Sequence, residues 1–430
     1  MDKNKWIEKL GNFANKINSY KYIIAIKNAF TALIPVIITG AFATLFSNMV
    51  FDSTMGLAKF DALSFLAELK PIAQSINYAT MNMLTISAVF LIGLEVGKLN
   101  KVNGFFPGLL AVISYISVNP TTVELMVNEK LQVVPDVLAR QYTDTKGLFL
   151  GMFIAILSVE LFTWLGKQEK LTIKMPDTVP PNVSRSFSAL IPTILTFTLI
   201  ATVGFAVYRL TGMYLYDIIY TIIQRPLENV MQGLPGILLL MFVSQVFWVI
   251  GIHGNQMIKP IREPLLLASI AVNTDAFNAG KEIPNIITMP FWDMYMSIGG
   301  SGVTIGLLVA IFLVGKRDDM KEIAKLSFGP GLFNINEPVI FGMPIMLNPI
   351  LAIPFIITPL ITGMIGYFAT AIGFAGKAVV MIPWTTPPII SAYLATAGSI
   401  GAVVTQLICI VVSIVIYLPF VKIANNRQAA

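Results

Sequence analysis

The stretch 245-QVFWVIGIHGNQMIKP-260 interrupts an apolar run with a compact group of polar residues, and it contains His253, the single histidine of the chain. Gly251 and Gly254 lie on either side of this histidine, where glycine allows the backbone to turn without a side-chain clash. Non-helical backbone at membrane depth is tolerated only where it is buried in protein or lines a cavity. We therefore predict a re-entrant hairpin over residues 232–262, with His253 near its tip.

The polar side chains at this tip are suited to holding a ligand. His253, Asn255 and Gln256 together offer hydrogen-bond donors and acceptors of both kinds. In a soluble core, a lone histidine is usually a structural residue whose hydrogen bonds are satisfied by its neighbours. Here the adjacent amides and the membrane setting favour a ligand-binding role over that structural one.

The composition places the whole chain in a membrane. Hydrophobic residues make up 56% of the 430 residues and charged residues 12%, about half the charged fraction of a soluble protein. Apolar runs long enough to cross about 30 Å of hydrocarbon begin near residues 30, 80, 104, 147 and 187, and cover 296–315, 350–375 and 400–421. The pattern predicts an all-α polytopic membrane protein.

The basic residues indicate orientation and are not arranged for nucleic-acid binding. The formal net charge is +6, but the lysines and arginines flank the apolar runs, with six lysines before the first run. A later cluster contains Lys316, Arg317, Lys321 and Lys325. By the positive-inside rule, both termini lie in the cytoplasm, which requires an even number of crossings. Residues 1–22 are basic and amphipathic, and we predict that they form a helix on the membrane surface. The alternative is a disordered tail.

A second interrupted segment is 329-GPGLFNINEPVIFGMPIMLNP-349, in which Glu337 is a carboxylate within an otherwise apolar stretch. Such a residue is a functional-site candidate in a membrane protein. Pro338 is typical of the first turn of a helix, so Glu337 would lie at a helix N-terminus, where the helix dipole favours its ionised form. We predict a second re-entrant hairpin over residues 326–350, in which Glu337 accepts a proton or holds a hydroxyl group. A purely structural helix cap is the alternative.

Tryptophans near these segments are candidates for stacking against a sugar ring. Trp384 lies among prolines in 381-MIPWTTPPIISAYLATAG-398, and Trp248 precedes the first tip. The faces of an indole ring suit the apolar faces of sugar rings. Tryptophan also gathers at lipid–water boundaries without any ligand. Both interpretations of Trp384 therefore stay open, and Trp248 is the weaker case.

Other chemistries have little support in the sequence. The chain has no P-loop, dinucleotide-binding fingerprint or HExxH motif. A structural zinc site needs about four ligands, which His253 and the single cysteine, Cys409, cannot supply. Cys409 lies in an apolar run and is interpreted as a packing residue. We expect no metal and no cofactor, because amides, aromatic rings, one carboxylate and one imidazole suit a neutral polyhydroxylated ligand.

The chain divides into a regular first half and an irregular second half. A proline-rich linker covers residues 171–182, and a boundary follows the fifth apolar run near Thr211. Both interrupted segments lie beyond this boundary. We predict an N-terminal transmembrane scaffold over residues 1–210, which packs and dimerises, and a C-terminal domain over residues 211–430, which contains the site.

Three motifs give the chain a family resemblance. FNINEPVIFGMP at 333–344, WVIGIHG at 248–254 and PWTTPP at 383–388 resemble the enzyme IIC component of the bacterial phosphoenolpyruvate-dependent sugar phosphotransferase system, in its lactose, cellobiose and diacetylchitobiose branch. The resemblance covers essentially the whole chain. It implies about ten transmembrane helices, two re-entrant hairpins and amphipathic surface helices in the bacterial cell membrane. It also implies a homodimer formed through the N-terminal half, and a mobile C-terminal half that carries a sugar by alternating access.

The same resemblance implies roles for the candidate residues. Glu337 and His253 correspond to the hairpin residues that contact the sugar and orient the C6 hydroxyl that becomes phosphorylated. The phosphoryl donor is a phosphocysteine on a separate IIB protein, with IIA upstream. We expect Glu337 to accept the hydroxyl proton. Diacetylchitobiose is the expected substrate, with cellobiose next. Recognition of the ring and its hydroxyls is assigned to Asn255, Gln256, Asn334, Asn336, Trp384 and Trp248.

Two other functions fit much of the same pattern. An ion-coupled secondary sugar transporter would use Glu337 as a proton or sodium site and would yield no phosphorylated product. A membrane receptor or scaffold would bind a sugar without carrying it across the membrane.

Overall fold

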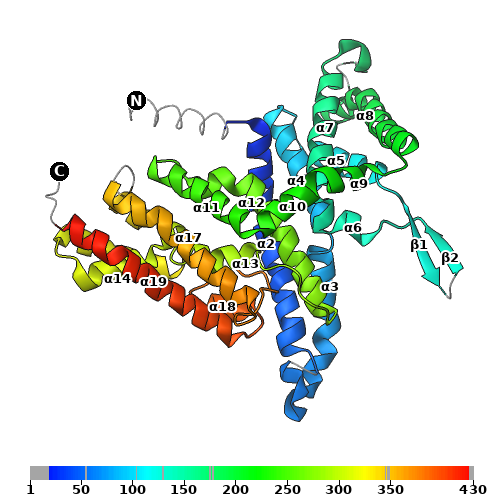
Figure 1. The fold of residues 1–430 in the computed structure, drawn as a ribbon. Helices are drawn as coiled ribbons and strands as arrows, with labels where there is room; N and C mark the ends of the chain where they lie inside the picture. The colour runs from blue at the N-terminus through cyan, green and yellow to red at the C-terminus, as the bar shows by residue number, and fades with distance from the viewer. Residues whose placement is uncertain are drawn as a thin grey trace. The chain divides into compact units, whose positions relative to one another are not determined.

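The structure, a computed structural model, describes residues 19–53, 56–102, 104–127, 130–173, 176, 179–343, 345 and 349–425 of the chain. Residues 1–18 of the predicted N-terminal surface helix lie outside these ranges. Within them, helices account for nearly all of the regular structure (Figure 1). The prediction of an all-α membrane protein is confirmed.

The described residues form two compact units, which do not follow a single cut of the chain. One, here called the α4–α8 unit, contains residues 19–37 and 78–227. The other, the α11–α19 unit, contains residues 38–77 and 228–425. Both interrupted segments belong to the α11–α19 unit. The functional division predicted between residues 210 and 211 stays a prediction.

Close packing of small and apolar residues builds the α4–α8 unit. Val89, Leu110 and Ile154 are fully buried in its core. A Cβ atom placed on Gly93 would lie 2.5 Å from the Cβ of Ala111, so the glycine lets two helices approach closely, as is common in membranes. The elements are α2 (Lys21–Leu45, which continues into the other unit), α4 (Leu84–Leu99), α5 (Phe106–Ser117), β1 (Thr122–Val127), β2 (Lys130–Pro135), α6 (Arg140–Thr143), η4 (Thr145–Gly147), α7 (Leu148–Gly166), η5 (Glu169–Leu171), α8 (Pro181–Thr211), α9 (Leu215–Ile219), η6 (Tyr220–Gln224) and α10 (Arg225–Gln232, which continues into the other unit from Glu228).

The two strands pair as an antiparallel hairpin, which is an addition to the predicted all-α fold. Thr122 lies opposite Pro135, and Val127 lies opposite Lys130. The strands connect α5 to α6 and take no part in the candidate site.

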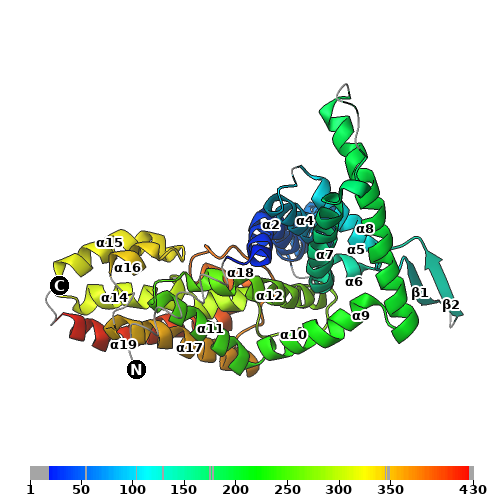
Figure 2. The same ribbon diagram turned by 90° about the horizontal axis from the view of Figure 1, so that it is seen from above.

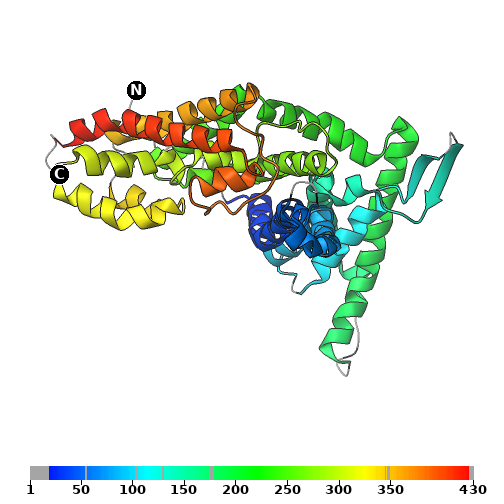
Figure 3. The same ribbon diagram turned by 90° about the horizontal axis from the view of Figure 1, so that it is seen from below.

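The α11–α19 unit places its longest helices side by side. Helix α14 packs against α19, and α17 packs against both α19 and α11. Figures 2 and 3 show α14 between α19 on one side and α15 with α16 on the other. The elements are η1 (Phe46–Val50), η2 (Leu57–Lys59), η3 (Asp61–Leu69), α3 (Lys70–Thr80), α11 (Leu234–Val249), α12 (Gly254–Asn278), α13 (Met289–Phe291), η7 (Trp292–Met296), η8 (Ser301–Val303), α14 (Ile305–Val314), α15 (Asp318–Leu332), α16 (Glu337–Gly342), α17 (Pro349–Ala371), α18 (Ile390–Ala395) and α19 (Ile400–Ala424).

Several helices are long and apolar enough to cross a membrane. The described residues contain six, or up to eight if each of two bent helix pairs is one span. A multi-pass membrane protein is therefore confirmed, while the count of ten helices stays a prediction. The six are Lys21–Asn48, Asp61–Leu99, Thr145–Gly166, Ser186–Thr211, Ile350–Ala371 and Ile400–Ala424.

Two apolar runs differ from the continuous spans that their composition predicts. The run that begins near residue 104 forms α5, whose 12 residues rise only about 18 Å. The run at 296–315 is helical in α14 only from Ile305, and a bend of 56° separates it from the preceding turns. Gly299, Gly300 and Gly302 adopt positive φ before that bend, a conformation that ends a helix and that glycine permits at little steric cost.

Candidate functional site

The turn between α11 and α12 presents His253. Helix α11 ends at Val249, Gly251 turns the chain with φ 91°, and His253 is the residue that precedes α12. A Cβ atom on Gly254 would overlap the carbonyl oxygen of Ser244, so glycine is required where α12 begins against α11. A turn is present at this histidine, between α11 and α12, and the re-entrant hairpin over residues 232–262 stays a prediction.

The turn between α15 and α16 presents Glu337. Helix α15 ends at Leu332, and α16 starts at Glu337 with Pro338 in its first turn, as the sequence predicts. Asn334 lies between them in the left-handed region with φ 62°, which asparagine tolerates better than most residues. Residues 344 and 346–348 of the predicted second hairpin lie outside the described residues.

The two turns bring the imidazole and the carboxylate together. Nε2 of His253 lies 3.9 Å from Oε1 of Glu337, with 41% and 48% of the two side chains exposed. This separation is longer than a direct hydrogen bond. The pair therefore faces an accessible space that a polar group of a ligand could enter.

Trp248 lies behind the histidine. The centroid of its ring is 4.1 Å from that of His253, with the planes inclined by 42°. Only 3% of Trp248 is exposed, so its ring offers little surface to a ligand in this conformation. The packing fixes the orientation of the imidazole.

Ser301 joins the two turns. Its Oγ accepts a hydrogen bond from Nδ2 of Asn255 at 2.9 Å, and its carbonyl accepts one from Nδ2 of Asn336 at 2.7 Å. Asn336 is buried and also donates to Oγ1 of Thr304 at 3.0 Å, while Oδ1 of Asn255 accepts from Oγ of Ser244 at 2.9 Å. These two predicted ligand amides are therefore engaged by the protein; Asn336 directly precedes Glu337, and Asn255 lies two residues after His253.

Asn334 ties the second turn to the segment that contains Trp384. Its Oδ1 accepts from the backbone N–H of Gly299 at 2.7 Å, and its Nδ2 donates to the carbonyls of Trp384 at 2.6 Å and Thr386 at 3.2 Å. Trp384 is 46% exposed, so its ring remains available. A side chain predicted to bind ligand thus positions another such residue.

Gln256 is the remaining amide of the first turn, and it is half-buried. Its backbone N–H donates to the carbonyl of His253 at 3.0 Å, which closes the first turn of α12. Among the residues that the structure describes, its side chain has no hydrogen-bond partner, so the amide is free to meet a ligand.

Ser244, Ser301 and Thr304 are residues of this network that the sequence does not single out. A signal exists in 297-SIGGSGVT-304, where three glycines and two serines interrupt an apolar run. The run resembles a continuous span when hydropathy is averaged along it, which hides the break.

Buried charges follow on α12, and they compensate one another. Nζ of Lys259 lies 3.5 Å from Oε1 of Glu263, and Nη2 of Arg262 lies 3.9 Å from the same oxygen. The guanidinium carbon of Arg262 lies 5.0 Å from the ring centroid of Trp292, within the range of a cation–π interaction. Paired charges of this kind fix α12 without requiring a ligand.

Comparison with known families identifies the chain. A family model described as "Phosphotransferase system, EIIC" matches residues 27–359. The chain belongs to the EIIC family. The resemblance inferred from the three motifs is confirmed, and this EIIC protein is a multi-pass membrane component of the phosphotransferase system.

Relatives of this EIIC protein match it over nearly its whole length. It is 34% identical over 98% of its residues to the "PTS system oligo-beta-mannoside-specific EIIC component" of Bacillus subtilis, covering 95% of that protein. It is 35% identical over 98% of its residues to the "Lichenan permease IIC component" of the same organism, covering 93% of that protein. A solved structure, the transporter ChbC, "the IIC component from the N,N'-diacetylchitobiose-specific phosphotransferase system", aligns with a TM-score of 0.92 and 33% identity. The alignment covers 98% of this chain and 97% of ChbC.

Proposed function

We propose that the chain is a sugar permease that binds a β-linked disaccharide, carries it across the bacterial cell membrane by alternating access, and presents its C6 hydroxyl to a phosphorylated IIB protein. The observation that carries this proposal is the separation of 3.9 Å between His253 and Glu337 at the tips of two different helix–turn–helix segments.

The geometry of the pair suits one hydroxyl group. An oxygen atom can lie about 2.8 Å from both Nε2 of His253 and Oε1 of Glu337, because these atoms are 3.9 Å apart. With its proton on Nε2, His253 donates to the hydroxyl oxygen, and the carboxylate of Glu337 accepts the hydroxyl proton. The pair therefore both locates the hydroxyl and orients its lone pair.

Phosphoryl transfer follows from this orientation. The hydroxyl oxygen attacks the phosphorus of the phosphocysteine on IIB, so that an O–P bond forms while the S–P bond breaks and the thiolate leaves with its electron pair. The hydroxyl proton passes to Glu337. The protein contributes positioning and electrostatics to an in-line transfer. The charged product is costly to return through a desolvated passage.

The remaining candidates divide by their contacts. Trp384 is exposed and Gln256 has a free amide, so these two residues are proposed to meet the sugar ring and its hydroxyls. Asn334 and Asn336 are proposed to hold the turn that carries Glu337, while Asn255 holds the turn that carries His253. Trp248 is proposed to support the imidazole.

The sugar class is supported by the relatives. The names of two of them give oligo-β-mannoside and N,N'-diacetylchitobiose, which are both β-linked. We propose diacetylchitobiose as the substrate, with cellobiose next. The proposal includes a homodimer formed through residues 1–210, both termini in the cytoplasm, and IIA as the protein that supplies IIB.

Equilibrium binding of labelled diacetylchitobiose to the purified protein tests this function, with cellobiose, lactose and maltose as competitors. Displacement by β-linked disaccharides and not by maltose is the expected result, and the order of the competitors ranks the substrates. Absence of saturable binding of any disaccharide would overturn the sugar class. Uptake driven by an ion gradient in proteoliposomes without IIB, with unmodified sugar as the product, would support ion-coupled transport instead.

A further inference from the structure

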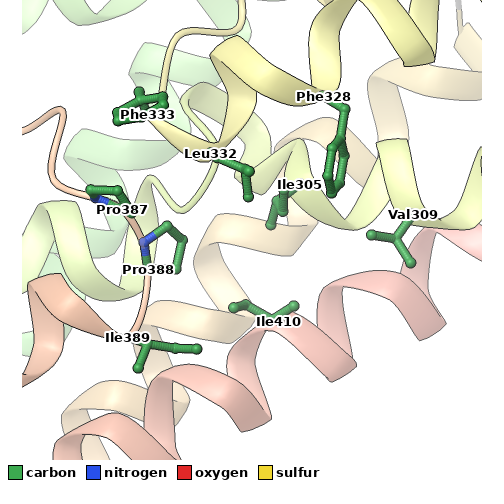
Figure 4. Close-up of a pocket in the computed structure, with 9 residues that line it drawn as sticks. All are labelled: Ile305, Val309, Phe328, Leu332, Phe333, Pro387, Pro388, Ile389 and Ile410. Carbon is green, nitrogen blue, oxygen red and sulfur yellow. The ribbon is translucent and has the colours of Figure 1, made fainter.

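Helix α14 carries an apolar cavity on the face that meets α15 and α19. The cavity has a volume of about 310 Å³, and its walls include Ile305 and Val309 of α14, Phe328 of α15, Ile410 of α19, and Pro388. Figure 4 shows these side chains converging from separate elements. The lining is almost entirely carbon, so the cavity suits a hydrocarbon chain and offers nothing to a sugar.

A second cavity follows further along α14 and differs in charge. Its volume is about 540 Å³, and Leu313 and Val314 line it together with Lys316, Lys422 and Asn425. The two lysines come from the ends of α14 and α19, far apart in sequence. The cavity therefore combines an apolar wall with two cations.

The two cavities lie along one stripe of α14. Ile305, Val309 and Leu313 follow each other at intervals of four residues, which places them on the same helix face. The stripe from Ile305 to Leu313 is about 12 Å long, close to half the roughly 30 Å thickness of a hydrocarbon core. Leu313 is 63% exposed. An apolar slot thus leads along α14 to a pair of cations at its end.

Neither lysine has an acidic partner among the residues that the structure describes. Arg317 pairs with Asp319, and Lys325 pairs with Glu322 at 2.7 Å, so the neighbouring cations are engaged. Among the described residues, no carboxylate lies within ion-pair distance of Lys316 or Lys422, and both lysines are exposed.

Asn425 fixes the backbone that carries one of these lysines. Its Oδ1 accepts from the backbone N–H of Lys316 at 2.9 Å, and its Nδ2 donates to the carbonyl of Val314 at 2.9 Å. Lysines at helix C-termini are favoured by the helix dipole without any ligand. The helix dipole does not explain why Lys316 and Lys422, from two different helices, line the same cavity next to the apolar one.

We propose that this face binds one anionic phospholipid, with its phosphate between Lys316 and Lys422 and an acyl chain in the apolar cavity beside α14. A lipid phosphate near a basic cluster at the membrane surface is stabilised by electrostatic attraction, and burial of each methylene adds to the binding. The proposal concerns a lipid site and does not depend on the sugar function proposed above.

Native mass spectrometry of the full chain, released from nanodiscs that contain equal amounts of phosphatidylglycerol and phosphatidylcholine, tests the site. The wild-type protein should retain phosphatidylglycerol in preference. Lys316→Gln/Lys422→Gln should lower that preference about tenfold. Lys321→Gln/Lys325→Gln is the matched control, because both of its lysines have acidic partners at 3.8 and 2.7 Å, and it should behave as wild type.

A second variant tests the apolar slot. Val309→Trp fills the cavity without changing the charge, and it should reduce retention of phosphatidylglycerol while both lysines remain. If this variant unfolds in detergent, the lysine pair still decides the proposal, because Lys316 and Lys422 are exposed and their substitution leaves the core intact.

Three outcomes would overturn the proposal. Unchanged lipid preference in the Lys316/Lys422 double variant would show that the lysines do not hold a phosphate. Displacement of phosphatidylglycerol by millimolar glycerol 3-phosphate or inorganic phosphate would assign the cavity to a soluble phosphate. Unchanged lipid preference with weakened binding of phosphorylated IIB would make the two lysines a protein-docking surface.

Discussion

Helix α7 and the segment 297–304 are both apolar in composition, but they satisfy their polar groups in opposite ways. In α7, Ser158 donates to the carbonyl of Ala155 and Thr163 to that of Val159, so each hydroxyl donates within its own helix. In 297–304, positive φ values at Gly299, Gly300 and Gly302 interrupt the helix, so buried backbone groups need hydrogen-bond partners from elsewhere.

Side chains from other elements form hydrogen bonds with the backbone groups of this segment. Asn334 accepts from the N–H of Gly299, Asn336 donates to the carbonyl of Ser301, and the hydroxyl of Tyr417 donates to the carbonyl of Gly302 at 2.7 Å. A continuous helix needs no such partners, whereas a broken one in a membrane does. The comparison teaches that a broken span needs hydrogen-bonding residues from remote parts of the sequence. Here two of those residues, Asn334 and Asn336, lie in the turn that carries Glu337.

The largest expected effect is at the carboxylate beside this break. Glu337→Gln removes the proposed proton acceptor, so phosphorylation-coupled uptake with IIB should fall about 10³-fold, while the amide still fills the same space. The measurement is the rate of sugar-phosphate formation in vesicles. Glu160→Gln on α7 is the control, since its carboxylate pairs with Lys21 at 2.7 Å on a continuous helix, and its rate should match wild type. Full activity of Glu337→Gln would refute the catalytic role.

The next largest effect is expected at Gly300. An added Cβ would lie 2.6 Å from Oδ1 of Asn336, at a φ of 93° that side chains rarely adopt. Gly300→Ala should therefore lower the free energy of unfolding by about 3 kcal/mol. Denaturant titration in detergent measures it. Gly166→Ala at the end of α7 meets nothing within 4 Å, so equal losses in the two variants would contradict the comparison.

A smaller loss is expected from the buried amide. Asn336→Ala leaves the carbonyl of Ser301 and the hydroxyl of Thr304 without their donor, and it should cost about 2 kcal/mol of unfolding free energy. Disaccharide affinity should fall as well, because the turn that carries Glu337 loses its brace. Ser158→Ala on α7 removes only a bond within its own helix and should change stability less. A stable Asn336→Ala protein with normal affinity would show that the amide is not a brace.

The smallest effect is expected at Tyr417, whose buried hydroxyl bonds the last glycine of the break. Tyr417→Phe deletes one hydroxyl that donates to Gly302, so unfolding free energy should fall by about 1 kcal/mol. Ser158→Ala on α7 provides the reference for a hydroxyl that bonds its own helix. A smaller loss from Tyr417→Phe than from Ser158→Ala would reverse the order that the comparison requires.

His253 and Glu337 could be predicted as site residues from the sequence, because residues of their types are rare in its apolar segments. His253 is the single histidine, and Glu337 is a carboxylate within a long apolar stretch, so both residues stand out by composition alone. Glycine and proline beside them also predict the turns that present them. Their separation could not be predicted, because it depends on how two remote segments pack.

The break that precedes α14 is the main feature that the sequence obscures. When hydropathy is averaged over the length of a span, residues 297–304 resemble part of a continuous helix. A serine or threonine in such a run is common. The role of Ser301 depends on Asn255 and Asn336 reaching it from two other elements. Contacts of that kind are set by tertiary packing and leave no local pattern.

Because Ser301 forms hydrogen bonds with both turns, the two halves of the proposed sugar site are mechanically joined. Separating them would break two hydrogen bonds, at about 1 kcal/mol each, and would leave polar groups bare in an apolar surrounding. We expect spin labels near the two turns to give the same distance in inward- and outward-facing states. The two turns would then move as one rigid body during transport. Access to the site from each side of the membrane would change while the distance between His253 and Glu337 stayed the same.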